Sequence, residues 1–418
     1  MAALSDLEAP LLRTAVDVKD SSSPSDHCAA NDESALALPA DYARLGPGVA
    51  TGALAVCTLG VWYSGLLFAR LATAFPRVEV FDQFGKAAFG RAGQRLVFAT
   101  IYACILITPV IFQITCTESL LTILGPGRLS PLAVHGVVLA IMLPLAQVRQ
   151  LEEVGWLSLA GTLSMVASVL IVLLKIVMLP ANGLPLAAAA EPSPGSGTSL
   201  RMGLVAFMDV VFAYGGAANW MRYISGMRRR SDFRKVAGVG AVFMTACYLA
   251  LGAVGYLKLG SNFDLSRPIT SVLPYDAWSV TMNGLLFLHC VVAYAININV
   301  WTDLVLHLLA AAHGVPTSHQ DSSSHRGSWA ATSCIGLAFC FLVAYTFPYF
   351  TIVVALISSV GDLAAAYALP ALFSLKLLKL PAWERCLCWA LVPLAFGLSG
   401  VGMYSSLHEL IAKMLGWD

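Results

Sequence analysis

The sequence MGLVAFMDVVFAYGGAANWMRYISGMRRRSDFRK, residues 202–235, decides how the chain is interpreted. It is an apolar run that carries Asp209, is interrupted by Gly215 and Gly216, resumes, and ends in a basic cluster. A helix that crosses lipid must satisfy its own backbone hydrogen bonds, so an interruption persists only where it lines a protein cavity. Many secondary transporters build substrate sites from such breaks. The stretch therefore predicts a transport site; the alternative is a glycine pair used for helix packing, with Asp209 in a structural pair.

The composition predicts a polytopic membrane protein embedded in a lipid bilayer. Of the 418 residues, 58% are hydrophobic and 12% are charged, whereas soluble domains carry about 25% charged residues. The net charge of +1 gives no reason to expect nucleic acid as a partner. The chain has no P-loop, HExxH sequence, nucleophile elbow or dinucleotide fingerprint, and its ten cysteines have no zinc spacing. We therefore expect neither an enzyme nor a metal site.

Apolar runs follow one another from residue 35 onward. A spanning helix needs about 20 apolar residues, whereas the segment 35–45 is long enough for only half a helix. We expect a disordered cytoplasmic tail at 1–34, a transmembrane domain at 35–412 and a short C-terminal tail at 413–418. The expected full spans are 48–75, 95–124, 131–148, 153–180, 202–226, 236–259, 278–311, 328–346, 347–376 and 386–412.

The placement of lysine and arginine predicts the orientation. With the N-terminus in the cytoplasm and the segment 35–45 counted as part of a crossing, 18 of the 25 basic residues fall on the cytoplasmic side and 7 on the other. Cytoplasmic loops are enriched in these residues. An acidic dileucine-like cluster at residues 8–12 resembles vacuolar or lysosomal sorting signals. The membrane is therefore expected to be either the plasma membrane or a vacuolar or lysosomal membrane.

Four segments, in order along the chain, resemble the amino acid/auxin permease family. ALALPADYARLG at 35–46 resembles the first-helix pattern LALPYAMAQLG, and FDQFGKAAFG at 81–90 is similar to YPDIGEAAFG. Residues 206–216, followed by Met227 and Phe233, resemble AFAFSGH…MK…F, and residues 345–370 resemble the tenth helix. The resemblance implies an all-α LeuT-like fold, a 5+5 inverted repeat plus one extra helix, with about eleven transmembrane helices and helices 1 and 6 broken. It also implies uptake of amino acids or related solutes.

The resemblance also indicates a site. In LeuT-like transporters the substrate lies at the helix breaks, with its carboxylate near the N-terminal end of a half-helix. By position, residues 214–217 form the break in helix 6, and their backbone groups are expected to hold the polar ends of the ligand. The side chain of Phe212 or Tyr214 is expected to form the pocket wall. The predicted substrate-binding residues are Phe212, Tyr214, Gly215, Gly216, Ala217 and Asn219.

Three residues are predicted to take part in ion coupling: Asp209, Tyr294 and Asn297. The last two fall in the segment that resembles helix 8 of the family, which often contributes to the coupling-ion site. A structural hydrogen bond between helices is the alternative. The expected coupling ion is a proton, with sodium as the alternative, and no resident cofactor is expected.

One departure from the family pattern bears on function. The family has Gly-x-Gly and a further apolar half-helix before LALP, whereas this chain has Asp32, Glu33 and Ser34 preceded by polar sequence. Helix 1 is therefore expected to be truncated, and we expect the chain to be a truncated or alternatively spliced product; the alternative is that it has given up that half of the site. The predicted function is secondary active transport of amino acids or similar solutes, most simply by proton symport. The alternatives are a non-transporting amino acid receptor or transceptor, and an inactive, truncated form of a transporter. The particular amino acid and the oligomeric state stay open.

Overall fold

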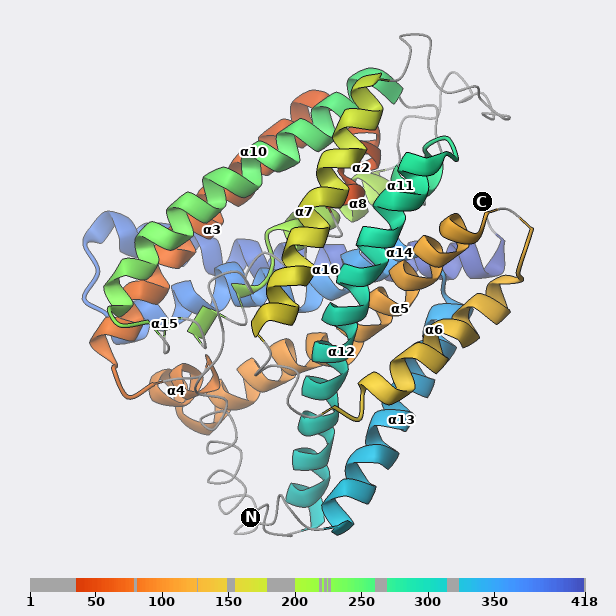
Figure 1. Ribbon diagram of the computed structural model, residues 1–418. Coiled ribbons are helices and arrows are strands. Elements are labelled where there is room, and N and C mark those ends of the chain that lie inside the picture. The colour runs from red at the N-terminus through yellow and green to blue at the C-terminus, as the bar shows by residue number, and fades with distance from the viewer. Residues whose placement is uncertain are drawn as a thin grey trace.

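A computed structural model of the chain describes residues 35–78, 81–125, 127–148, 155–178, 200–217, 220, 221, 224, 227–259, 269–313 and 323–416. Every regular element in these ranges is a helix (Figure 1). The predicted N-terminal tail, the departure at residues 32–34, and Asn219 lie outside the described residues.

The helices follow the apolar runs of the sequence. In chain order they are α2 (Leu38–Leu45), α3 (Pro47–Ala74), α4 (Phe81–Val97), η4 (Phe98–Tyr102), α5 (Ala103–Leu124), α6 (Pro131–Leu145), α7 (Gly155–Met178), α8 (Leu200–Ala213), η7 (Arg230–Asp232), α10 (Phe233–Leu259), α11 (Ile269–Val272), α12 (Ala277–His313), α13 (Ser323–Thr346), α14 (Phe350–Ile357), η8 (Ser358–Asp362), η9 (Ala364–Ala368), α15 (Leu369–Leu377) and α16 (Ala382–Leu415).

Eight helical stretches in the described part are long and apolar enough to cross a membrane. Two of the runs expected to span form shorter helices. In the run 131–148, α6 covers 15 residues, with Pro131 in its first turn and the Ser130 side chain accepting a hydrogen bond from Ala133 N. In the run 202–226, α8 covers 14 residues and ends at Ala213. Only one residue therefore separates the end of helix α8 from Gly215 and Gly216, the pair that predicted the interruption.

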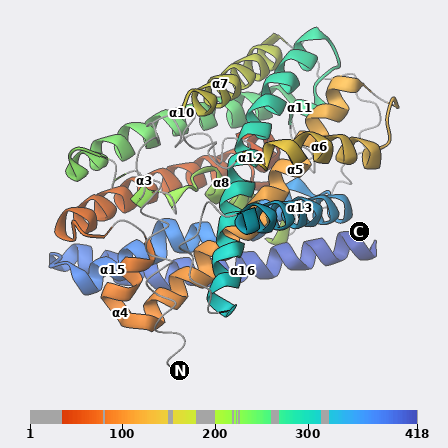
Figure 2. The same ribbon diagram turned by 60° about the horizontal axis from the view of Figure 1, so that its bottom comes forward.

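One spanning stretch forms the centre of the bundle and another lies at its edge. Residues 350–377, which comprise α14, η8, η9 and α15, are buried more completely than the other seven stretches, whereas α16 is the least buried. Helix α16 packs along α8, α14 and α15 on the outside of the bundle (Figure 2). A helix that is apolar on all sides and enclosed by others is typical of a bundle core, so any polar group on the central stretch is costly unless it has a partner.

The short helix α2 packs between α8 and α10. Gly46, with φ 78°, separates it from α3. A Cβ atom on Gly252 of α10 would lie 2.5 Å from Tyr42 Cε2, and one on Gly255 would lie 2.7 Å from Pro39 Cγ. These two glycines therefore allow α2 to approach the α10 backbone closely.

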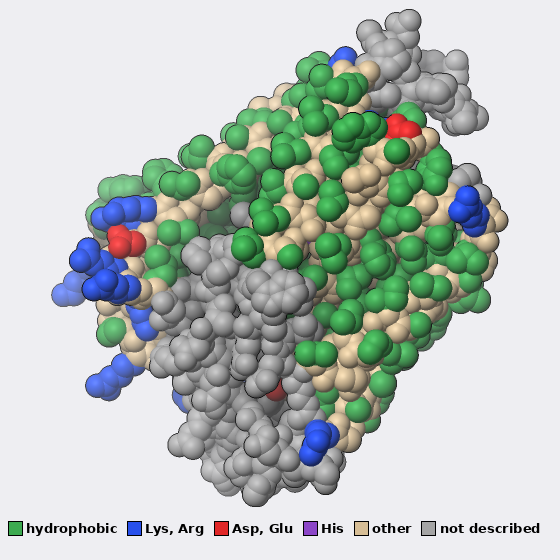
Figure 3. Space-filling model, in the orientation of Figure 1, with side chains coloured by type: hydrophobic (Ala, Val, Ile, Leu, Met, Phe, Trp, Pro, Cys, Tyr) green, Lys and Arg blue, Asp and Glu red, His purple; other side chains and the backbone are tan. Residues whose placement is uncertain are grey.

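Basic side chains gather at one end of the molecule. Figure 3 shows lysine and arginine clustered where α3 ends and α10 begins. Arg230 donates to the carbonyl oxygen of Val78 over 3.1 Å, and Arg70 Nη1 lies 2.5 Å from Glu384 Oε2. The basic cluster of the opening stretch is thus held against the end of α3.

Candidate functional site: the break after α8 and its buried carboxylates

The predicted interruption of the helix is confirmed. The N–H of Tyr214 donates to Val211 O over 3.1 Å and that of Gly215 donates to Phe212 O over 2.8 Å, so tight i to i+3 bonds close the helix. Gly216 has φ 91°, a backbone conformation that glycine adopts without steric cost. Gly215 and Gly216 keep accessible surface, whereas Phe212 and Tyr214 are buried. The backbone at the break is therefore more open than the side chains around it.

The side chain of Tyr214 attaches the break to two neighbouring helices. Its hydroxyl lies 3.0 Å from Thr58 Oγ1 on α3 and 2.9 Å from Thr245 Oγ1 on α10. Its ring packs edge-on against Tyr248, with ring centroids 5.2 Å apart. The Tyr248 hydroxyl in turn donates to Ala213 O over 2.7 Å. Because its hydroxyl already has these partners, Tyr214 fixes the end of α8 in place, and Phe212 packs in the adjoining apolar core.

Asp209 belongs to a buried cluster of three charged side chains. Arg44 Nη1 lies 3.7 Å from Asp209 Oδ2 and 3.6 Å from Asp41 Oδ1. Both carboxylates are fully buried, and Arg44 is 6% exposed. Arg44 is thus the cation that both buried carboxylates share. Two ionised carboxylates and one guanidinium carry a net charge of −1, and one proton added to either carboxylate cancels that charge. With that proton the cluster is electrically neutral.

Sequence reasoning singled out Asp209 but missed its two partners. Asp41 and Arg44 stand where the pattern LALPYAMAQLG has alanine and glutamine. Two charges that replace small or neutral residues on one half-helix, three positions apart, are a signal that was present in the sequence. Their shared partner on α8 was not visible, because it lies far along the chain.

A second carboxylate faces the break from the centre of the bundle. Asp362 accepts a hydrogen bond from the backbone N–H of Gly216. Its Oδ2 atom is buried and has no hydrogen-bond partner among the described residues. It closes η8, one of two π-helical turns in the central stretch, and such turns are frequent at functional sites. A Cβ atom on Gly361 would meet Cys104 Sγ, so η8 is pressed against α5. Asp362 was not among the residues that the sequence predicted for the site.

The other predicted ion-coupling residues lie on α12, which packs against α5, α7 and α13. Tyr294 is buried, and its hydroxyl has no hydrogen-bond partner among the described residues. Asn297 Nδ2 donates to Ala293 O of its own helix over 2.8 Å. Within the described part of the chain, no ion pair or hydrogen bond joins either residue to Asp209.

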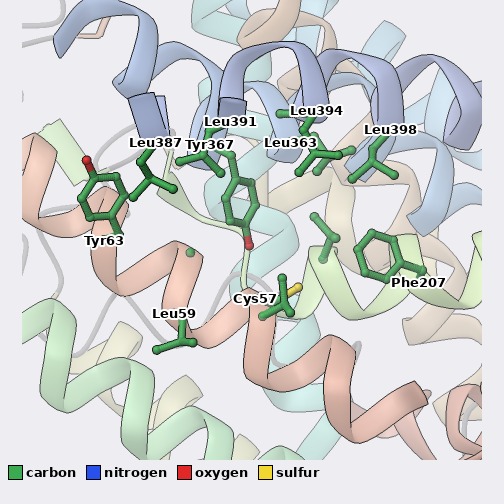
Figure 4. Close-up of a pocket in the computed structure, with 14 residues that line it drawn as sticks. Cys57, Leu59, Tyr63, Phe207, Leu363, Tyr367, Leu387, Leu391, Leu394 and Leu398 are labelled. Atoms are coloured by element: carbon green, nitrogen blue, oxygen red, sulfur yellow. The ribbon is translucent and has the colours of Figure 1, made fainter. Parts of the chain in front are cut away.

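An apolar cavity of about 280 Å³ lies beside the break, between α3, α8, η9 and α16 (Figure 4). The ring of Tyr367 crosses it with the hydroxyl directed toward Cys57, and leucines of α16 form one wall. None of its lining side chains is charged. The cavity suits hydrocarbon and lacks partners for the charged ends of an amino acid.

Comparison with known proteins gives a family and a fold. The family described as transmembrane amino acid transporter protein matches residues 30–412. Amino acid transporter AVT1E of Arabidopsis thaliana is 24% identical over 375 residues, which cover 84% of this chain and 66% of that protein. The chain thus spans slightly less than two thirds of that relative. The N amino acid transport system protein of Neurospora crassa is 22% identical over 90% of this chain and 82% of its own length.

Among solved structures, a manganese transporter of Eremococcus coleocola aligns with a TM-score of 0.51 at 11% identity, covering 92% of this chain and 86% of that one. This likeness concerns the fold alone, and it supports the predicted all-α LeuT-like arrangement.

Proposed function

We propose that this chain, which belongs to the transmembrane amino acid transporter family, is a secondary active transporter that moves amino acids across a membrane by proton symport. The observation that carries the proposal is the buried cluster of Asp41, Arg44 and Asp209. Asp209 lies four residues, about one helical turn, before the last residue of α8. A proton-binding group thus adjoins the interrupted backbone that is proposed to hold the substrate.

The cluster offers a physical route for coupling. While one of the two carboxyl groups carries a proton, the three side chains are neutral together. Loss of that proton leaves a net negative charge in a buried position, which is strongly unfavourable without water or another cation. The charge is relieved when α2 and α8 separate and admit water. Protonation thereby controls the contact between two helices, one of which ends at the substrate break.

Asp209 is a better proton carrier than the two predicted residues on α12. A carboxyl group takes up and releases a proton readily, whereas the amide of Asn297 does not titrate and a phenol such as that of Tyr294 holds its proton under ordinary conditions. Sodium coupling remains the alternative in which Tyr294 and Asn297 would take part.

The substrate is proposed to bind through the backbone of residues 214–217, with Phe212 contributing to the apolar wall. The basic end of the molecule (Figure 3) is assigned to the cytoplasm because cytoplasmic loops are enriched in lysine and arginine. This assignment agrees with a cytoplasmic N-terminus.

Uptake into liposomes tests the proposal. Purified full-length chain is reconstituted, and uptake of a labelled mixture of neutral amino acids is measured with an inward proton gradient, an inward sodium gradient, or neither. The proton gradient is expected to drive accumulation. Gly216→Leu is expected to abolish uptake, because leucine fits poorly at φ 91° and fills the break. Gly240→Ala is the matched control, since its Cβ meets no atom within 4 Å.

Three results would contradict the proposal. Uptake that responds only to sodium would contradict proton coupling, and unchanged uptake by Gly216→Leu would contradict the site. Binding of an amino acid without transport would favour the alternative function of a non-transporting receptor.

A further inference from the structure

The carboxylate of Asp362 and the end of α8 meet at the same point. Asp362 accepts the N–H of Gly216, and η8 packs directly against α8 and α5. The buried Oδ2 atom has no hydrogen-bond partner among the residues that the structure describes. A buried carboxylate oxygen without a partner is costly, so a hydrogen-bond donor brought by a ligand would stabilise it.

The electrostatics favour a cationic donor. The C-terminal end of a helix carries a partial negative charge from the aligned dipoles of its peptide groups. The last residue of α8 is Ala213, close to the glycine that contacts Asp362. The ion pairs found within the described residues do not include Asp362. Two sources of negative potential therefore converge at Gly215 and Gly216 without a neutralising side chain among those pairs.

Hydrogen-bond geometry narrows the class of cation. One N–H from Gly216 leaves the carboxylate with free acceptor capacity, and the accessible backbone of the two glycines lies beside it. An ammonium group carries up to three donors and no acceptor, so it can bond to Oδ2 and to backbone carbonyls together. A second carboxylate at this point would be repelled.

We propose that Asp362 binds the ammonium group of the substrate at the break after α8, so that the site accepts amino acids and rejects otherwise similar acids that lack the amine. This inference rests on the proposed transport function and narrows its substrate class. It separates amino acids from related carboxylic acids that lack an amine.

Competition for uptake tests this role in the unmodified protein. Reconstituted chain takes up the labelled amino acid mixture in the presence of unlabelled phenylalanine or of 3-phenylpropionate, which has hydrogen in place of the amino group. Phenylalanine is expected to compete at least about tenfold more strongly, the effect of one lost charge-assisted hydrogen bond. Equal competition by the two compounds would overturn the proposal without any mutation.

Asp362→Asn then assigns the effect to this side chain. Asparagine keeps an acceptor for the Gly216 N–H and removes the charge, so the unfolding temperature should change little while the KM for amino acid uptake rises about tenfold or more. The preference for phenylalanine should also collapse, and Asp362→Glu should restore part of it. Glu384→Gln is the matched control, because that carboxylate pairs with Arg70 away from the break.

The failures of the two proposals are distinguishable. Absence of uptake by the folded unmodified chain would count against the transport function itself. Uptake by the unmodified chain together with an unchanged KM and an unchanged preference in Asp362→Asn would overturn the role of Asp362 alone.

Discussion

Arg44 lies between two buried carboxylates, and its guanidinium is what makes their burial tolerable. Its Nη1 atom is 3.6 Å from Asp41 Oδ1 and 3.7 Å from Asp209 Oδ2. A protein with a buried ion pair is often no more stable than one with apolar residues in its place. Removal of a single partner, however, leaves an unpaired charge in the interior. The cluster therefore adds little net stability while it makes each member sensitive to loss of the others.

Replacement of Arg44 is predicted to destabilise the fold through the charges that it leaves behind. Arg44→Met should lower the free energy of unfolding by about 3–5 kcal/mol. Adding Asp41→Asn and Asp209→Asn should restore most of that loss, because no buried charge remains. Unfolding of detergent-purified protein, followed by heat or denaturant, measures both steps.

The control for this series is Arg201→Met. Arg201 is exposed and contacts His408, so its loss should change stability by at most about 1 kcal/mol. A stability loss for Arg44→Met as small as that of Arg201→Met would show that the buried cluster is not a coupled set of charges.

Among the elements, α2 depends on the close approach of α10. Pro39 and Tyr42 of α2 occupy the space above two glycines of α10, Gly255 and Gly252. The contact also positions Asp41 and Arg44, which lie on the same short helix. The geometry of the proton site is therefore set by small residues on a helix that supplies none of its charges.

Gly255→Ala is predicted to move α2 and destabilise the protein. The added Cβ would lie 2.7 Å from the rigid ring of Pro39, and overpacking of this kind costs about 1–3 kcal/mol. Gly240→Ala on the same helix meets no atom within 4 Å and should be neutral or slightly stabilising, because alanine favours helix. Thermal unfolding of the two variants should shift in opposite directions. A shift for Gly255→Ala that matches Gly240→Ala would contradict the described packing of α2.

The sequence predicts those features of the elements that depend on local chemistry. Gly215 and Gly216 within an apolar run predicted the end of α8, and Gly216 has φ 91°, which glycine adopts without steric cost. Hydropathy likewise located most of the spanning helices. The partners within the site were not predictable in this way. Contacts of Arg44 with Asp209, and of Asp362 with Gly216, join segments far apart in the chain and depend on helix packing.

Tyr214 is a second example of a residue whose contacts the local sequence does not predict. Its position at the break predicts a pocket wall, and the structure adds contacts of its hydroxyl with Thr58 and Thr245. The direction of a side chain at the end of a helix depends on which neighbours surround it. That information lies in the arrangement of α3 and α10 rather than in the local sequence.

At the scale of the whole molecule, two carboxylates lie on elements that pack against each other, α8 and η8. The central stretch of residues 350–377 carries Asp362, and α8 carries Asp209, while the outer helix α16 borders an apolar cavity. Carboxylates enclosed by a membrane bundle are costly and typically mark ion or substrate pathways. This distribution supports a single central route in which one carboxylate carries a proton and the other contacts the substrate.

The most direct test of proton symport measures the proton itself. Liposomes that contain the purified chain and an entrapped pH-sensitive dye receive the amino acid mixture from outside, with equal pH on both sides. The account predicts that the interior acidifies as amino acids enter, and that Asp209→Asn exchanges amino acids across the membrane without acidification. Amino acid entry without acidification in the unmodified chain, or equal acidification in Asp209→Asn, would contradict it.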